Sequence, residues 1–379
     1  MTKRQNWVVI GLFLILIFGL TAATILKPDT EFSEKENRVL AQMPRLSADS
    51  YFSGTFAKDY ETYITDQFVF RDQWIRMKTA VERATLKQEA KGIYFGKDGY
   101  LIEKHQDSFN TSTASNNIRY LSAFMEKMKA EYGEGHATAM VIPNAVVILK
   151  DKLPPLAPES EEEDYLKMLG KALPEGTWFD ASGVLGEHKE EEIYYRTDHH
   201  WKTLGAFYTY EAWAKSVGLS PLSIDNYQVE TVSADFYGTI EAKVGVDVPG
   251  DTIQIFQPKQ EIAYTVTDGS TGEERTDLYD WSYLETRDQY SIFFGGNKPF
   301  VQVAIENDSD RRLLVIKDSY AHCFLPFTFH DFSRVDFVDL RYFNESLQEL
   351  REKGRYTDIL FLYNASGFAE DPSVVKLGN

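Results

Sequence analysis

The chain opens with an unbroken apolar run and then changes to helical and strand-like patterns. Residues 7–26 carry no charge, and at 1.5 Å per helical residue they reach about 30 Å, the thickness of the hydrocarbon core of a bilayer. Lys3 and Arg4 precede the run, so it predicts a single-pass anchor with a cytoplasmic basic end and an extracytoplasmic main portion. A signal peptide cleaved near residues 21–23 is the alternative and would make the protein secreted, although the run is longer than a usual signal core.

Two helices and a hairpin are expected next. Residues 28–50 have no hydrophobic period and mix charges with Pro and Ser, which is typical of a tether. Apolar positions recur every three or four residues over 54–86 and predict two helices that meet near residues 66–70. Residues 92–102 read as two short strands around a Lys-Asp-Gly turn. The chain thus divides into a cytoplasmic tip and anchor (1–27), a tether with N-terminal helices (28–92) and a main domain (93–379).

The main domain alternates strand-like and helix-like segments. Such alternation predicts an α/β domain with a mainly parallel sheet that helices cover on both faces. Two polar segments, 151–164 and 266–288, are expected to be surface loops. The expected helices span 116–132, 202–217 and 345–353, and the expected strands span 137–147, 312–317, 335–340 and 358–363.

Charge and cysteine content exclude several classes of protein. The chain has 40 Lys and Arg against 58 Asp and Glu, a net charge of -18, so it should repel nucleic acid at long range. The single cysteine, Cys323, cannot form an intramolecular disulfide, and it reads as a small core residue rather than as a nucleophile. No pattern in the sequence calls for a cofactor.

Candidate chemistry lies where apolar strands end, because ligands of open α/β sheets bind at the carboxyl ends of the strands. Ser319 follows the strand at 312–317 and sits on a turn that suits a nucleophile beside free N–H groups. The structural alternative is that Ser319 caps a short helix.

A second candidate is the Asp-x-His pair formed by Asp198 and His200. The carboxylate can hold Nδ1 of the ring and leave Nε2 free to take a proton from a serine. A helix cap or a metal site that includes His199 are the alternatives. We expect no metal, because adjacent residues seldom converge on one ion and the other histidines lack ligand spacing.

Two further turns offer hydrogen-bond donors for an oxyanion. Tyr363 begins a turn after the strand at 358–363, and Gly296 with Asn297 follows what reads as another strand end at residues 290–292. Glycine N–H groups and Asn or Tyr side chains suit this role, but the same residues are common in ordinary turns.

The residues resemble a known family. Thr197-Asp198-His199-His200-Trp201 is similar to the motif of the DHHW proteins, relatives of the AlgJ and AlgX alginate O-acetyltransferases in the SGNH hydrolase-like superfamily. Further segments resemble the family in order along the chain: Glu36-Asn37-Arg38, residues 63–68 with Arg71, residues 96–101, residues 236–239, residues 295–297 and residues 317–322.

The resemblance implies an SGNH-hydrolase-like three-layer α/β/α domain behind one transmembrane helix. It assigns Ser319 as the nucleophile, His200 as the base and Asp198 as the acid that orients it. It also suggests Tyr363, Asn297 and Gly296 as oxyanion or substrate-binding residues.

The expected function is extracytoplasmic transfer of acetyl groups, through an acyl-serine, to hydroxyls of a cell-surface or exported polysaccharide of a bacterial envelope. The resemblance implies an acetyl donor supplied by a membrane acyltransferase of the MBOAT type. A carbohydrate O-acetylesterase with the same triad, or a non-catalytic subunit of a polysaccharide biosynthesis complex, are the alternatives.

Overall fold

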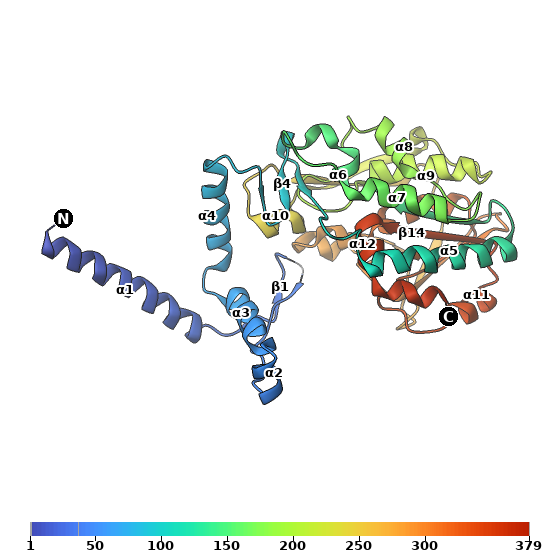
Figure 1. The fold of residues 1–379 in the computed structure, drawn as a ribbon. Helices are drawn as coiled ribbons and strands as arrows, with labels where there is room; N and C mark the ends of the chain where they lie inside the picture. Colours follow the sequence, from blue (N-terminus) through green and yellow to red (C-terminus); the bar gives the residue numbers. More distant parts are fainter. Residues whose placement is uncertain (1, 37, 379) are drawn as a thin grey trace. The chain divides into compact units, whose positions relative to one another are not determined.

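The chain forms two compact units. The computed structural model describes residues 2–36 and 38–378, so Asn37 of the Glu36-Asn37-Arg38 motif lies outside the described residues (Figure 1). One unit comprises Met1–Lys87 and Ala242–Asp247, and the other comprises Gln88–Glu241 and Val248–Asn379.

The first unit contains the predicted apolar helix and the two predicted helices behind it. Within the described residues, α1 is the one helix long and apolar enough to cross a membrane, a test that a signal sequence also passes. The two helices meet at residues 68–70, as predicted. The unit comprises α1 (Lys3–Leu26), β1 (Phe32–Ser33), β2 (Arg38–Val39), α2 (Ala48–Phe52), α3 (Thr55–Gln67) and α4 (Arg71–Ala84).

An ion-pair cluster ties the segment after α1 to α3 and α4. Arg38 Nη2 lies 2.6 Å from Asp66 Oδ1, and Arg71 Nη1 lies 2.8 Å from Glu36 Oε1. The hydrogen bond from Arg38 lowers the pKa of Asp66, so the carboxylate stays charged. These motif residues therefore have a structural role, and the expected tether is folded against the two helices.

A seven-stranded sheet runs through the second unit in the order β10-β9-β11-β13-β12-β14-β6. β13, β12, β14 and β6 are parallel to one another, whereas β11 pairs antiparallel with β13, and β9 and β10 continue the sheet in further antiparallel pairs. The strands are β6 (Ala137–Ile142), β9 (Tyr264–Asp268), β10 (Glu274–Arg275), β11 (Phe300–Ile305), β12 (Arg312–Lys317), β13 (Arg334–Val338) and β14 (Asp358–Asn364).

The sheet is therefore mixed, and the prediction of a mainly parallel sheet is right for one half only. The difference arises in part because the polar segment 266–288, expected to be a loop, supplies the edge strand β10 and the end of its neighbour β9. A short edge strand buries few side chains, so it lacks the apolar run by which a central strand is recognised.

Apolar clusters cover both faces of the sheet. Successive side chains of β12 alternate between them: Leu313 and Val315 join one cluster, and Leu314 and Ile316 join the other. The first cluster includes α8 (Ala181–Glu187), α9 (Thr203–Ser216) and the antiparallel pair β7 (Tyr227–Phe236) and β8 (Asp251–Pro258). The second includes α5 (Ser112–Tyr132), α7 (Glu161–Ala172), α11 (Leu347–Gly354) and α12 (Ala365–Glu370), of which α12 contacts β14 and α5 contacts β6 (Figure 1).

Short elements complete the second unit. The predicted hairpin at residues 92–102 is confirmed as an antiparallel pair, to which one more strand is added. These elements are β3 (Glu89–Ala90), β4 (Ile93–Phe95), β5 (Leu101–Glu103) and α6 (Ala145–Ile148), and α10 (Thr239–Val244) carries the chain from the second unit into the first.

Three parallel strands deliver polar residues to one edge of the sheet. β6 is followed by Asn144, β12 by Asp318 and Ser319, and β14 ends at Asn364. Because the carboxyl ends of parallel strands meet at the same edge, these residues converge where α/β sheets bind ligands.

Candidate active site

Ser319 stands at the first position of a 3₁₀ helix, Ser319–Cys323, directly beyond β12. The cap of this helix is Asp318, whose Oδ1 accepts the N–H of Tyr320 at 2.9 Å and whose Oδ2 accepts the N–H of Asn364 at 2.8 Å. The alternative that Ser319 itself caps the helix is therefore not observed. Its hydroxyl is directed to another partner.

That partner is His200, and Asp198 lies behind it. Ser319 Oγ is 2.8 Å from His200 Nε2, and His200 Nδ1 is 2.6 Å from Asp198 Oδ1. The three residues that the sequence singled out are thus brought together in one chain of hydrogen bonds. With an ionised carboxylate, Nδ1 must carry the proton and donate it, which leaves the lone pair of Nε2 to accept the serine hydroxyl.

The surroundings of Asp198 keep its carboxylate ionised. Burial by itself would raise the pKa of Asp198, but the charges of His199 and His200 and the hydrogen bonds that it accepts hold that pKa well below its ordinary range. Oδ1 also accepts the N–H of His200 at 3.0 Å, and Oδ2 accepts the N–H of Thr239 at 3.0 Å. The Asp198 side chain is therefore charged and fixed, as an orienting carboxylate must be.

Close backbone approach makes this arrangement possible. A Cβ at Gly238 would lie 2.2 Å from the Cβ of Asp198, so no larger residue fits there. Gly238 N–H donates to Thr197 Oγ1 at 3.1 Å, and Thr197 in turn donates its N–H to the buried Asp251 at 2.8 Å. Thr197, the residue before Asp198, is thus fixed by hydrogen bonds to two other segments of the chain.

Trp201 and Tyr320 join the two segments of the site. Trp201 Nε1 donates to the carbonyl of Tyr320 at 2.8 Å, and the hydroxyl of Tyr320 donates to the carbonyl of His199. Both side chains are buried. This pair of hydrogen bonds fixes the distance between His200 and Ser319.

A buried polar network supports the turn from the side of α7. Asn364 Nδ2 donates to Asn144 Oδ1 at 2.7 Å, while Asn144 donates its N–H and its Nδ2 to Glu162 at 2.6 and 2.9 Å. Because Asn364 also binds Asp318, the network reaches from a buried glutamate to the residue before Ser319. Burial raises the pKa of Glu162 to about 7, against the opposing effect of the two hydrogen bonds from Asn144.

Glu162 should make the stability of the fold depend on pH. The folded chain keeps a proton that the unfolded chain releases near pH 4.5, so the free energy of unfolding falls as pH rises through the window from 4.5 to about 7. The loss is on the order of 3 kcal/mol at the upper end. Glu162→Gln removes this slope, and unfolding by urea at a series of pH values measures it.

The neighbouring Glu163→Gln is the matched control, because that side chain is 39% exposed and pairs with Lys150 and Lys167 at the surface. Its unfolding free energy should keep the slope of the wild type. Equal slopes in Glu162→Gln and wild type would contradict a buried, proton-binding Glu162.

The carboxylate and two imidazoles of the site also form a group with metal-ligand chemistry. One ligand atom each from Asp198, His199 and His200 lies within 4.8 Å of the others. Nδ1 of His200 is already bonded to Asp198, and Nδ1 of His199 is 3.0 Å from Thr239 Oγ1. A metal ion would have to displace these hydrogen bonds, so the expectation of a metal-free site stays a prediction.

The three residues expected to line an oxyanion site have other contacts. Tyr363 is fully buried in the cluster on the α5 face, with its hydroxyl 3.4 Å from Asp371 Oδ2, because alternation along β14 turns it away from the face that carries Leu362. Gly296 donates its N–H to the carbonyl of Phe293, and Asn297 Oδ1 accepts from Arg341 at 3.3 Å. These contacts give all three a structural explanation, and none of them is a contact to Ser319.

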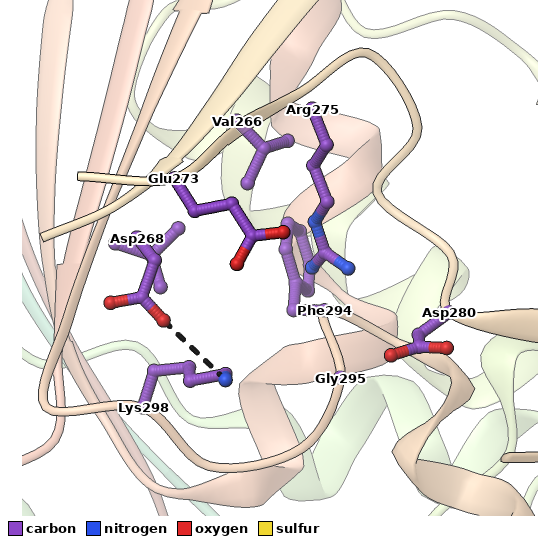
Figure 2. Close-up of a pocket in the computed structure, with 9 residues that line it drawn as sticks. Val266, Asp268, Glu273, Arg275, Asp280, Phe294, Gly295 and Lys298 are labelled. Atoms are coloured by element: carbon purple, nitrogen blue, oxygen red, sulfur yellow. Dashed lines mark ion pairs between the residues drawn. The ribbon is translucent and has the colours of Figure 1, made fainter. Parts of the chain in front are cut away.

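The turn at Gly295 instead borders a small charged cavity of about 120 Å³ (Figure 2). Figure 2 shows Glu273 and Arg275 beside each other in it, with Lys298 paired to Asp268 at 3.4 Å. Residues 290–292, which the sequence predicts to be a strand end, lie in a 3₁₀ helix, Gln289–Ile292. None of Ser319, His200 and Asp198 lines this cavity.

Sequence reasoning missed several supports of the site. Tyr290 stacks on His200, and Asp251 and Glu162 hold the neighbouring loops. The segment Phe236–Thr239 was noted only as part of a resemblance, although its glycine and threonine contact Asp198. An isolated polar residue in a loop carries no spacing signal that would predict such contacts.

Comparison with known proteins identifies the family. Residues 100–338, more than half of the chain, match the model of the DHHW protein family, so the chain belongs to that family. The resemblance predicted from the motifs is therefore confirmed. No curated protein matches the chain.

Two of the solved structures described next, with TM-scores above 0.5, share the fold, and a third is more distantly similar. A DHHW family protein from Eubacterium siraeum is 23% identical with a TM-score of 0.63, and the match covers 77% of this chain and 96% of that one. Bacillus cereus PatB1, solved with a sulfonyl adduct, is 20% identical with a TM-score of 0.58 over 74% and 96% of the two chains. The O-acetyltransferase domain of Pseudomonas putida AlgJ is 13% identical with a TM-score of 0.46 over 75% and 97%.

Proposed function

We propose that this protein is an SGNH-type serine O-acetyltransferase that moves acetyl groups onto hydroxyls of a cell-surface or exported polysaccharide. The observation that carries the proposal is the hydrogen-bonded sequence of Ser319 Oγ, His200 Nε2, His200 Nδ1 and Asp198 Oδ1, with separations of 2.8 and 2.6 Å. The family supports it, and so do the helices on both faces of the sheet, which agree with a three-layer SGNH-like domain.

The first half of the reaction loads the enzyme. Ser319 Oγ attacks the carbonyl carbon of the acetyl donor while its proton passes to His200 Nε2. The tetrahedral intermediate then collapses, the bond to the leaving oxygen breaks, and that oxygen takes the proton from His200. The products are acetyl-Ser319 and the deacetylated donor.

The second half delivers the acetyl group. A sugar hydroxyl gives its proton to His200 Nε2 as it attacks the acetyl carbon, and Ser319 Oγ leaves with that proton. Asp198 stays ionised throughout and stabilises the imidazolium formed in each half. His200 and Asp198 are only 6% and 5% exposed, whereas Ser319 is half-buried, so donor and acceptor reach the triad from the side of the serine.

The location and partners follow from the apolar helix and the charge. With α1 as an uncleaved anchor, the second unit lies outside the cytoplasm, where acetyl-CoA is absent. The family resemblance suggests the donor there, a multi-span membrane acyltransferase of the MBOAT type that passes the acetyl group outward. The net charge of -18 favours a neutral polymer as acceptor.

The test is the mass of the intact full-length chain in detergent micelles after incubation with an activated acetyl ester. We expect one acetyl group on the wild type and none on Ser319→Ala, with faster loss in the presence of oligosaccharides than in water alone. Because PatB1 has been solved with a sulfonyl adduct, we also expect a sulfonyl fluoride to label Ser319 of this chain. An exposed serine, Ser270, provides the matched control for both reagents.

The other outcomes separate the alternatives. Loss of the acetyl group to water at the same rate with and without oligosaccharides would replace the transferase by an esterase. A wild type with no adduct on Ser319 from either reagent would overturn the covalent mechanism and leave a non-catalytic subunit of a biosynthetic complex.

A further inference from the structure

One aromatic ring lies flat on the imidazole of the site. The ring centroids of Tyr290 and His200 are 3.8 Å apart, and the ring planes differ by 16°. The hydrogen bonds of His200 to Ser319 and Asp198 run through its two ring nitrogens, in the plane of the imidazole. They leave tilting out of that plane unopposed, and a parallel ring in van der Waals contact opposes this tilt.

The hydroxyl of the same side chain reaches the serine. Tyr290 OH donates to the backbone carbonyl oxygen of Ser319 at 3.1 Å, and Cys323 Sγ lies 3.4 Å from the phenol oxygen. Tyr290 is 3% exposed, and its burial raises the pKa of the phenol well above its ordinary value. The phenol therefore stays protonated and remains a donor over the whole working range of pH.

Tyr290 is itself held in place by its neighbours. It belongs to the 3₁₀ helix Gln289–Ile292. The C-terminal end of this helix is joined to the preceding segment, because the N–H of Asp280 donates to the carbonyl of Ile292 and the N–H of Phe294, just beyond the helix, donates to the carbonyl of Leu278. The ring centroids of Phe293 and Tyr195 lie 5.5 and 6.2 Å from the ring centroid of Tyr290. Because Tyr290 is held in one position, it can in turn restrict the positions of His200 and Ser319.

We propose that Tyr290 is a positioning residue for acyl transfer, whose ring face orients His200 and whose hydroxyl holds the main chain of Ser319. The inference rests on the proposed function and deepens it. One side chain thus sets the imidazole and the nucleophile relative to each other. The electron-rich face of the phenol also favours the imidazolium that forms when Ser319 loses its proton.

Two substitutions separate the ring from the hydroxyl. Tyr290→Phe keeps the stack and loses the hydrogen bond to Ser319, so the rate constant of acetyl-Ser319 formation should fall by less than about tenfold. Tyr290→Leu loses both, and the rate constant should fall by about 10² with the KM for the acetyl ester unchanged, because misplacement of reacting groups by about 1 Å has that effect. The control is Tyr279→Leu. Tyr279 is another buried tyrosine, and it contacts Phe293, which lies between it and Tyr290, so this variant should retain the wild-type rate.

A spectroscopic measurement reports the stack without any reaction. In the full-length chain labelled at histidine, the ring current of Tyr290 should shift the His200 carbon-bound protons upfield, with the signals assigned by His200→Gln. The shift should persist in Tyr290→Phe and become clearly smaller in Tyr290→Leu, where the rings of His199 and Tyr320 remain near His200. Partial rescue of the rate by Phe together with retention of the shift is the signature of positioning rather than of general stability.

Each remaining outcome counts against the inference. A Tyr290→Leu chain that is acetylated at the wild-type rate, or a His200 signal that does not move, would overturn it while the proposed function stands. Equal losses of rate in Tyr290→Leu and Tyr279→Leu would show a stability effect instead. A wild type with the shifted His200 signal but no acetyl-Ser319 would overturn the proposed function, and the positioning role for that reaction with it.

Discussion

Replacing Asp198 by Asn should lower the rate of Ser319 acetylation by about 10⁴. The amide can present its NH₂ group to His200 Nδ1, and the imidazole would then carry its proton on Nε2. That proton faces Ser319 Oγ, now 2.8 Å from a donor rather than from a base. The ring keeps its place while the hydroxyl loses its proton acceptor.

The measurement is the time course of acetyl-Ser319 formation by intact mass on the full-length chain, with the thermal midpoint of unfolding recorded in parallel. Asp225→Asn, at an exposed position, is the control and should react as the wild type does. If Asp198→Asn forms the acetyl-enzyme within tenfold of the wild-type rate, Asp198 does not set the tautomer of His200.

The second large effect is expected from a single methyl group at Gly238. Ala at this position places its Cβ 2.2 Å from the Cβ and 2.3 Å from Oδ2 of Asp198, far inside van der Waals contact. Neither backbone can move freely, because Gly238 N–H is bonded to Thr197 and Thr239 N–H to Asp198. We expect a loss of unfolding free energy of about 3 kcal/mol and loss of acetylation as Asp198 is pushed from His200.

Gly183→Ala is the matched control, since a Cβ there meets nothing within 4 Å and the residue lies within α8. It should leave acetylation unchanged and stabilise the helix slightly. Urea unfolding and the acetylation assay on both variants decide the matter. A Gly238→Ala chain as stable and as active as the wild type would show that the loop can relax around the extra carbon.

Strongly patterned segments could be predicted from the sequence with good boundaries. The strand Arg312–Lys317 and the helices α3 and α4 were expected where they are found, because buried strands and amphipathic helices show their period over many residues. α5 begins at Ser112, before the expected residue 116, because its first turn is fixed by a hydrogen bond from the N–H of Ala114 to Thr111 Oγ1 rather than by apolar residues.

The sequence predicted only those residues of the candidate site whose types and spacing along the chain indicate a function. Asp198 and His200 lie two residues apart, and Ser319 follows a recognisable strand, so their candidacy could be read from spacing. Tyr290 and Glu162 contact the candidate site from segments that are distant in the sequence, and no spacing of residues along the chain predicts such contacts. The face on which Tyr363 lies was not predictable for the complementary reason: a strand end predicts the edge of the sheet, but one step of alternation decides which face a side chain joins.

The order of the strands along the chain determines when, during synthesis, the candidate site can form. β6 forms its parallel ladder with β14, so before Asp358–Asn364 has been made Ala137–Ile142 has only the isolated parallel bridge from Ala139 to Trp178. β12, which delivers Ser319, lies between β13 and β14 and depends on the same late strand. His200 therefore exists long before the serine can be held beside it, and a nascent or truncated chain that lacks β14 carries an incomplete sheet. On the proposed function, acetylation of Ser319 would therefore occur only in chains whose synthesis has passed β14.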